Sequence, residues 1–174
     1  MNAGAYGRDW ADIVERVQVV GADGGAWLTP AELAFSYRHS SVVGGHVVAR
    51  VEFRLLPRDP SEIRREVSEL NRRRKETQPI NRRTFGSVFK NPEHELGAGP
   101  MLDGCGLKGH TVGGARISPR HANFIENVDA ATASDALKLM AEARRRALEQ
   151  YGVVLEREVE LLGDLELPPA GEQL

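Results

Sequence analysis

Thr84-Phe-Gly-Ser-Val-Phe-Lys-Asn-Pro92 is the stretch of this 174-residue sequence that says most about its fold and its chemistry. The glycine-serine step allows a tight backbone path that can leave the Ser87 hydroxyl uncrowded. Phe89 can be buried behind that hydroxyl, while Lys90 and Asn91 offer a cation and an amide to an anionic ligand. The proline then ends any regular element. Taken alone, the same residues could equally form an ordinary turn that carries a hydroxyl.

The composition limits the class of protein without choosing a function. Hydrophobic residues make up 41% of the sequence and charged residues 28%, as in soluble globular proteins. A formal net charge of -2 gives no general attraction to nucleic acid or to a membrane. The single cysteine, Cys105, excludes an intrachain disulfide framework and suits a reducing compartment. With no long apolar run and no signal-peptide pattern, we expect a cytoplasmic protein that binds neither nucleic acid nor membrane.

The first third of the sequence is rich in strand patterns. The pattern of Val17–Val20 predicts a strand that ends in a glycine-rich turn. Residues 26–28 could form the strand that pairs with it. Thr29, followed by proline and then by glutamate three residues on, predicts a capped helix start. Residues 46–56 alternate well enough for a long strand. The face of that strand expected to be apolar consists of Val47, Ala49, Val51, Phe53 and Leu55.

Two longer helices are predicted further along the chain. Asp59 opens a capping box for a helix that runs to about Lys75, and its expected apolar stripe consists of Ile63, Val67 and Leu70. Thr132 caps the second helix, which is expected to run to about Tyr151 and to end at Gly152. The buried side expected for this second helix consists of Leu137, Met140, Ala141, Leu148 and Tyr151.

The remaining segments have weaker patterns. Residues 78–120 are rich in glycine, and long loops of that kind inside a compact domain are usually functional. We expect a short helix at residues 100–104 and a strand at residues 121–125. Residues 153–162 alternate as a final strand, and the tail that follows Gly163 is expected to be frayed.

Several other kinds of site are disfavoured by the spacing of the residues. The five histidines are scattered and the lone cysteine has no partner, so a metal site is not supported. Ser87 lacks the second glycine of a nucleophile elbow, and Gly113-Gly114 follows no Rossmann or P-loop pattern. The basic run 72–75 fits a solvated helix face near its carboxyl end. Lys75 differs because it lies just before the Gln78-Pro79 break, where it can turn toward a site.

A series of short blocks carries a resemblance to a known family. Besides Thr84–Pro92, the blocks are Asn2–Gly7, Ser36–Ser40, Gly106–Gly109, Gly113–Ala115, His121–Ile125 and Leu155–Val159. In this order they resemble UDP-N-acetylenolpyruvoylglucosamine reductase, also called UDP-N-acetylmuramate dehydrogenase, a flavoenzyme family of bacterial cell-wall synthesis. The resemblance covers the chain from Met1 to about Gly163. The interval between Arg38 and Ser87 holds no extra tyrosine-bearing loop, which resembles the family's second type.

The resemblance implies roles for three catalytic residues. Ser87 would donate a proton to the carbanion-like intermediate that forms once a hydride has been added to the enolpyruvyl double bond. Arg38 would bind the substrate carboxylate and draw electron density from that double bond. Glu158, rather than Glu156, would donate a hydrogen bond as the enolate develops. Without the resemblance, Arg38 is interpreted as a surface arginine, and the glutamates are interpreted as the solvent-facing side of a half-buried strand.

The resemblance also implies ligands. Lys75 and Asn91 match positions that bind the UDP-sugar substrate, and His121 lies near a third such position. The flavin cofactor is FAD, with NADPH as the hydride donor, and the residues expected to contact FAD are Asn2, Ala3, Gly4, Ala5 and Gly7. The chain departs from the family's usual pattern at three positions: Phe85 stands where a small residue is usual, Glu160 stands where a basic or neutral residue is commoner, and Arg116 replaces a frequent glutamine.

The expected fold is α+β: the remnant of a two-lobed FAD-binding domain, followed by a small α/β substrate-binding domain. Residues 1–57 form the remnant, 58–76 the connecting helix and 77–151 the substrate-binding domain. Residues 152–164 form a C-terminal strand that carries the catalytic glutamate, and 165–174 form a tail.

The resemblance also predicts what this chain lacks. The family's glycine-rich loops that hold the FAD diphosphate precede the Asn2–Gly7 block, so an N-terminal FAD-binding half is expected as a partner. We therefore expect that the isolated chain does not bind FAD tightly, aggregates or dimerises, and shows little reductase activity. Two hypotheses stay open: a catalytic part that works with that half, or a catalytically incompetent fragment that at most binds the UDP-sugar.

Overall fold

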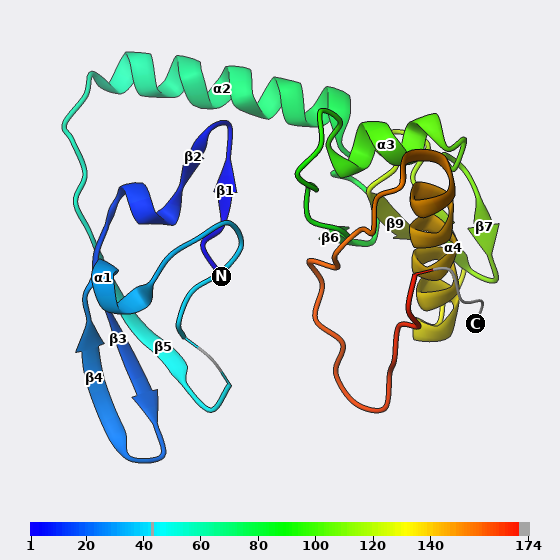
Figure 1. Cartoon of the computed structure of the whole chain (residues 1–174). Helices are drawn as coiled ribbons and strands as arrows, with labels where there is room; N and C mark the ends of the chain where they lie inside the picture. Colours follow the sequence, from blue (N-terminus) through cyan, green and yellow to red (C-terminus); the bar gives the residue numbers. More distant parts are fainter. Residues whose placement is uncertain (43, 171–174) are drawn as a thin grey trace. The chain divides into compact units, whose positions relative to one another are not determined.

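The structure is a computed structural model, and it describes residues 1–42 and 44–170 (Figure 1). The chain divides into two compact units, Met1–Ile63 and Arg64–Leu174. The boundary between them falls inside a helix, and each unit is described by itself below. Both units combine helices with antiparallel sheets, which confirms the expected mixture of helix and sheet.

The first unit is built around a three-stranded antiparallel sheet with the order β4-β3-β5. Its strands are β3 (Val14–Gly21), β4 (Gly24–Leu28) and β5 (Val47–Phe53). A small hairpin, β1 (Gly4–Ala5) and β2 (Arg8–Asp9), precedes the sheet and leads into the 3-10 turn η1 (Trp10–Asp12). The short helix α1 (Pro30–Leu33) starts with the predicted capping box at Thr29 and places Leu33 in the core. That core consists of Val14, Val17, Val19 and Leu33.

The apolar face predicted for residues 46–56 is largely uncovered. In the first unit β5 pairs with β3 along one side, so it is an edge strand of this sheet. Val47 is 67% exposed and Leu55 70% exposed, and only Val51 of the predicted face packs against the core of the first unit. The alternation therefore predicted the strand correctly but not the burial of its apolar face, because alternation alone does not show that a partner layer exists.

The long helix α2 (Pro60–Thr77) begins as predicted but buries none of its side chains. The Asp59 carboxylate accepts hydrogen bonds from the backbone N–H groups of Ser61 and Glu62, which caps the first turn. Of the apolar stripe predicted on this helix, Ile63 and Val67 are exposed and Leu70 is half-buried. The surface of the last turns instead carries intrahelical ion pairs, which link Glu69 to Arg72 and Arg73, and Arg72 to Glu76.

The second unit contains a four-stranded antiparallel sheet with the order β6-β9-β8-β7. Its strands are β6 (Thr84–Ser87), β7 (Thr111–Val112), β8 (Ala115–Ile117) and β9 (Phe124–Asn127). The strand predicted at residues 121–125 therefore starts later, because His121 to Asn123 form the turn that leads into it. Thr84 pairs with Glu126 and Ser87 with Phe124, so the register shifts between the two pairs.

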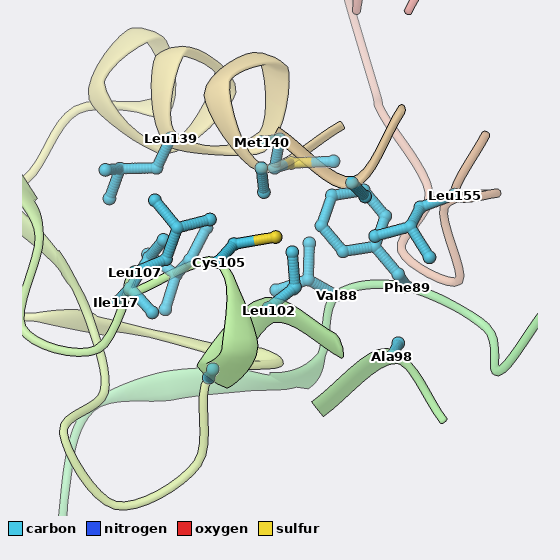
Figure 2. Packing of buried hydrophobic residues seen from close by; sticks show 14 of the residues in the cluster. Val88, Phe89, Ala98, Leu102, Cys105, Leu107, Ile117, Leu139, Met140 and Leu155 are labelled. Atoms are coloured by element: carbon cyan, nitrogen blue, oxygen red, sulfur yellow. The ribbon is translucent and has the colours of Figure 1, made fainter. Parts of the chain in front are cut away.

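Helices α3 (Ala98–Gly104) and α4 (Ala133–Tyr151) cover one face of this sheet (Figure 1). α4 begins at the predicted Thr132 capping box and ends at Gly152, which adopts the left-handed conformation with φ +69°. Figure 2 shows the core beneath the helices, where Leu139 and Met140 of α4 meet Leu102 of α3 and the side chains of Val88 and Phe89. Met140 is a core residue, as predicted, and Tyr151 packs at the margin of the core.

The C-terminal segment differs from the prediction in two ways. Residues 153–162 do not form a regular strand: one isolated bridge joins Arg157 to Phe89, and the neighbouring residues are extended without a continuous ladder. The tail that follows Gly163 was predicted to be frayed, but its described part, up to residue 170, packs against the second unit. Leu165 and Leu167 pack against the core, and the Arg144 guanidinium donates hydrogen bonds to the carbonyls of Leu155 and Pro168. Residues 171–174 of the predicted tail lie outside the described residues.

A charged pair lies on the face of the sheet opposite the helices. Ala115 and Ile117 of β8 point into the core, so Arg116 between them points to the other side, where it faces its cross-strand partner Glu126. Arg116 Nη2 donates to Glu126 Oε2 at 2.7 Å, and Glu126 is buried. Burial alone would raise the pKa of Glu126, but the hydrogen bonds from Arg116 and Ser118 outweigh it and keep that pKa below its ordinary value.

No helix in the described part of the chain combines the length and apolar character that crossing a membrane requires.

Replacing Thr132 by alanine should lower the free energy of unfolding of the second unit by about 1 kcal/mol. The Thr132 hydroxyl accepts from the Asp135 N–H at 3.1 Å, and alanine leaves that donor without its protein partner. Urea denaturation followed by circular dichroism measures the effect. Thr132→Ser keeps the hydroxyl and is the matched control, so an equal loss in both variants would contradict the cap as the cause.

Replacing Glu126 by glutamine should destabilise the second unit at pH 7 by about 1–3 kcal/mol, because it removes the buried carboxylate to which Arg116 donates. The folded-state pKa of Glu126 is lowered, so its contribution is present above the ordinary pKa and is lost as pH falls through the folded pKa. The difference between native and variant proteins should therefore shrink as pH falls below the ordinary pKa of a glutamate and through the lower folded pKa of Glu126. Exposed Glu95→Gln is the control; a gap that persists at low pH contradicts the assignment.

Candidate functional site

Ser87 is the last residue of β6, at the point where the strand leaves its regular pairing with β9. Gly86 just before it has φ +88°, which glycine adopts without strain and which accompanies the local shift of register. The two residues that follow, Val88 and Phe89, are buried in the core. The chain is therefore anchored immediately behind Ser87, while Ser87 itself is only partly buried.

The segment that carries Glu158 lies beside this anchor. The Glu158 N–H donates to the Val88 carbonyl at 2.8 Å, and the Lys90 N–H donates to the Glu156 carbonyl at 2.9 Å. The Lys90 ammonium also meets the Glu156 carboxylate at 2.5 Å. The backbone of Glu158 is thus hydrogen-bonded to Val88, the residue directly after Ser87, although the two segments are far apart in the sequence.

Asn91 and His121 both lie against the first turn of α3. The Asn91 side-chain oxygen accepts from the Ala98 N–H at 3.0 Å, and a Cβ atom at Gly97 would lie 2.8 Å from that oxygen. A Cβ atom at Gly99 would lie 2.5 Å from His121 Cε1. Both glycines therefore let these side chains approach the helix more closely than any other residue would allow.

His121 is set up as a neutral imidazole. Its Nδ1 accepts a hydrogen bond from the Asn123 N–H at 3.2 Å, and its ring packs edge-on against Phe124 with the centroids 4.9 Å apart. Burial and then the positive charge of Lys108 lower the pKa of His121 below its ordinary value. At neutral pH the ring can therefore offer an Nε2–H donor to a ligand.

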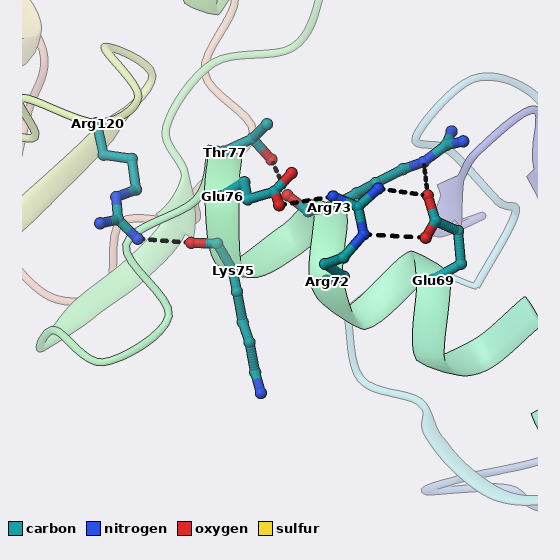
Figure 3. Close-up of polar contacts among 7 residues, drawn as sticks. All are labelled: Glu69, Arg72, Arg73, Lys75, Glu76, Thr77 and Arg120. Carbon is teal, nitrogen blue, oxygen red and sulfur yellow. Dashed lines mark hydrogen bonds and ion pairs between the residues drawn. The ribbon is translucent and has the colours of Figure 1, made fainter. Parts of the chain in front are cut away.

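Lys75 lies at the rim of a cationic cavity of about 460 Å³ in the second unit. Its backbone carbonyl accepts from Arg120 Nη1 at 2.6 Å, and Figure 3 shows the Lys75 side chain extending away from that contact. The charged residues that line the cavity are Lys75, Arg82, Arg116, Arg120 and Glu126. Four cations against one carboxylate make this cavity suitable for an anionic ligand.

Sequence reasoning did not identify Arg82 and Arg120 as candidate site residues. They lie 38 positions apart in the numbering and belong to two separate loops, so no local motif connects them. The available signal was the position of Lys75. The chain was predicted to break after Gln78, so the loop that follows, which contains Arg82, could return toward Lys75.

The first unit brings together the remaining predicted residues. Arg38 Nη2 donates to the Gly4 carbonyl at 2.9 Å, and Arg38 adopts φ +53°, which is uncommon for a residue with a side chain. Asn2 is buried, and its amide binds the Asp9 carboxylate, the Ser36 carbonyl and the Ala11 N–H. Asn2 therefore organises this loop from within, whereas Ala3, Gly4, Ala5, Tyr6 and Gly7 of the block are exposed or partly exposed.

The predicted site residues thus form one set in each unit. The second unit gathers Ser87, Asn91, His121 and Glu158 around β6, β9 and the start of α3, with Lys75 at the neighbouring cavity. Arg38 and the Asn2–Gly7 block form the other set. Within residues 1–42 and 44–170, no group of three or more histidine, cysteine or acidic side chains could hold a metal ion.

Comparisons with known proteins show which family the chain resembles. Residues 78–162 match the family model described as UDP-N-acetylenolpyruvoylglucosamine reductase, C-terminal domain. The UDP-N-acetylenolpyruvoylglucosamine reductase of Anaeromyxobacter dehalogenans (strain 2CP-C) is 46% identical over 169 residues, which are 97% of this chain and 50% of that protein. The protein of the same name from Methylococcus capsulatus is 42% identical over 165 residues, 94% of this chain and 54% of that protein.

A solved structure extends the agreement to three dimensions. The crystal structure of UDP-N-acetylenolpyruvylglucosamine reductase from Thermus caldophilus matches with a TM-score of 0.79 and 41% sequence identity, covering 92% of this chain and 57% of that chain. The chain spans about half the length of the curated relatives that it matches. On these likenesses, the chain belongs to the UDP-N-acetylenolpyruvoylglucosamine reductase family.

Proposed function

We propose that this chain carries the substrate-binding and proton-donating part of a flavin-dependent reductase. The reaction reduces UDP-N-acetylglucosamine enolpyruvate to UDP-N-acetylmuramate, a precursor of peptidoglycan. The observation that supports the proposal is the pairing of the Glu158 segment with the residues directly after Ser87, through the hydrogen bond from the Glu158 N–H to the Val88 carbonyl. Membership of the reductase family supports the same reaction.

The residues of the first unit fit only part of a flavin site. Ala3, Gly4, Ala5 and Gly7 offer small side chains and backbone groups that could lie along a flat ring, whereas the Asn2 amide is already engaged inside the loop. The sequence contains no Rossmann or P-loop glycine pattern for a dinucleotide diphosphate. FAD reduced by NADPH would supply the hydride, and we propose that most of its binding surface lies in the part of the relatives that this chain does not span.

Ser87 would donate the proton that completes the reduction. A hydroxyl is a weak acid, so it needs a short path to the acceptor carbon and a polar surrounding that disperses charge. The buried Val88 and Phe89 fix the backbone behind Ser87, and Lys90 supplies a positive charge three residues away. Glu158 would act on the substrate carboxylate from the adjacent segment, where it can stabilise the developing enolate by a hydrogen bond.

Basic groups of this chain would bind the anionic groups of the substrate. In the second unit, Lys75 and the cationic cavity beside it would receive the diphosphate of the UDP-sugar, with Asn91 and His121 donating further hydrogen bonds. In the first unit, the Arg38 guanidinium would bind the enolpyruvyl carboxylate. Arg38 is held in place through its hydrogen bond to the Gly4 carbonyl.

Replacing Lys75 by alanine should weaken binding of UDP-N-acetylglucosamine enolpyruvate to this chain by about tenfold or more, because one charge-assisted contact to phosphate is lost. Isothermal titration calorimetry measures the dissociation constant. Ser87→Ala should bind as the native chain does, and Lys138→Ala, an exposed lysine on α4, is the matched control. Equal effects of Lys75→Ala and Lys138→Ala would contradict the assignment of Lys75.

Turnover should appear when the chain is joined to the half of the Anaeromyxobacter dehalogenans reductase that the match does not cover. In that chimera, Ser87→Ala should lower kcat by about 10²–10⁴-fold, because the proton donor is lost. Oxidation of NADPH followed at 340 nm in the presence of the UDP-sugar measures the rate, and Ser134→Ala on the surface of α4 is the control.

The two experiments together separate the hypotheses. Binding of the UDP-sugar without turnover in the chimera would favour a catalytically incompetent fragment that keeps its pocket. Turnover that survives Ser87→Ala would contradict the role of Ser87. Absence of both binding and turnover would contradict the proposed function.

A further inference from the structure

The side chain of Asn123 forms a two-way contact with the backbone of Phe89. Asn123 Oδ1 accepts from the Phe89 N–H at 2.9 Å, and Asn123 Nδ2 donates to the Phe89 carbonyl at 2.8 Å. The main chain of Asn123 is engaged as well: its carbonyl accepts from the Val88 N–H, and its N–H donates to His121 Nδ1. The residue is 4% exposed, so these contacts are made away from water.

The Asn123 side chain takes the place of a backbone hydrogen-bonded pair of the sheet. β6 leaves its ladder with β9 at Ser87, after a register shift that coincides with the positive φ of Gly86. A primary amide carries a donor and an acceptor side by side, as a peptide unit does. The Asn123 amide therefore continues the pairing of the chain one residue beyond the point where the backbone of β9 can reach it.

Residues 88–90 are hydrogen-bonded along their other edge to the C-terminal segment. The Val88 carbonyl accepts from the Glu158 N–H, and the Lys90 N–H donates to the Glu156 carbonyl. Residues 88–90 thus lie between Asn123 on one side and residues 156–158 on the other. The Asn123 side chain fixes the orientation of the Phe89 peptide groups, and that orientation decides which way the Val88 carbonyl and the Lys90 N–H point.

We propose that Asn123 is a positioning residue that sets the placement of Glu158 relative to Ser87. The inference rests on the proposed function, because that function gives the placement of Glu158 relative to Ser87 a catalytic role. The hydrogen-bonded connection from Asn123 through residues 88–90 to Glu158 is a feature of the fold and does not depend on that function. The Asn123 side chain acts through residues 88–90, and its backbone N–H separately donates to Nδ1 of His121, another predicted site residue.

Amide hydrogen exchange of the whole 174-residue chain, followed by NMR, tests the linkage without any ligand. In Asn123→Asp the Phe89 N–H keeps an acceptor, but the Phe89 carbonyl loses its donor and faces a carboxylate. We expect exchange of the Glu158 and Lys90 amides to accelerate by about tenfold or more. The Ile117 amide, which donates to the His110 carbonyl elsewhere in the same unit, should change by less than about twofold.

Two further variants keep the test decisive. Asn123→Ala removes both side-chain contacts without adding a charge, and it should give the same local pattern if the aspartate variant does not fold. Asn127→Asp is the matched control on β9, because its side-chain oxygen only accepts from the Ala131 N–H and aspartate preserves that contact. Equal acceleration at Glu158, Lys90 and Ile117 would indicate general destabilisation and overturn the proposal, as would no acceleration at Glu158.

The catalytic consequence is measured in the chimera described above. Asn123→Ala should lower kcat by about tenfold or more while KM for the UDP-sugar changes by less than about threefold, because positioning of the reacting groups is lost and the diphosphate contacts remain. An active chimera with unchanged kcat overturns the positioning role. A chimera that is inactive even with native Asn123 counts against the proposed function instead, and the exchange experiment then still decides the linkage.

Discussion

The second unit depends on one constraint: the buried backbone of residues 88–90 must find hydrogen-bond partners on both of its edges. Val88 and Phe89 insert their side chains into the core, so their peptide groups are withdrawn from water and unpaired groups there would be costly. Asn123 serves one edge and residues 156–158 serve the other. Because hydrophobic burial and polar pairing involve the same three residues, packing of the core and geometry of the candidate site cannot vary independently.

The sequence predicted elements well wherever a local signal was sufficient. Thr29 and Thr132 form the expected capping boxes, and Gly152 ends α4 in the left-handed conformation, because capping involves only neighbouring residues. Predictions failed where the outcome depended on distant partners. Residues 153–162 alternate like a strand but make one isolated bridge, and the apolar stripe of α2 is not buried within the described chain. Periodicity reveals a preference for a conformation, while burial requires a second surface that no local pattern reports.

The candidate site shows the same division. The Thr84–Pro92 block contained Ser87, Lys90 and Asn91, and the resemblance added Glu158, which the structure places beside the same block. Asn123 was assigned only to a strand and to the His121–Ile125 block. Its side-chain contact with Phe89 spans 34 positions, so no local pattern in the sequence indicates it. Contacts of this kind follow from topology, so a single sequence cannot reveal them before the strand order is known.

The glycines of α3 have a consequence for the order in which the second unit assembles. A seven-residue helix that contains Gly99, Pro100 and Gly104 has little tendency to form on its own. Its first turn is completed by the Asn91 side chain and packed by the His121 ring, both of which come from other parts of the chain. Nucleation of α3 should therefore wait until those segments have docked. Its helicity would then be a late event in folding, and one that reports on assembly of the site rather than on local propensity.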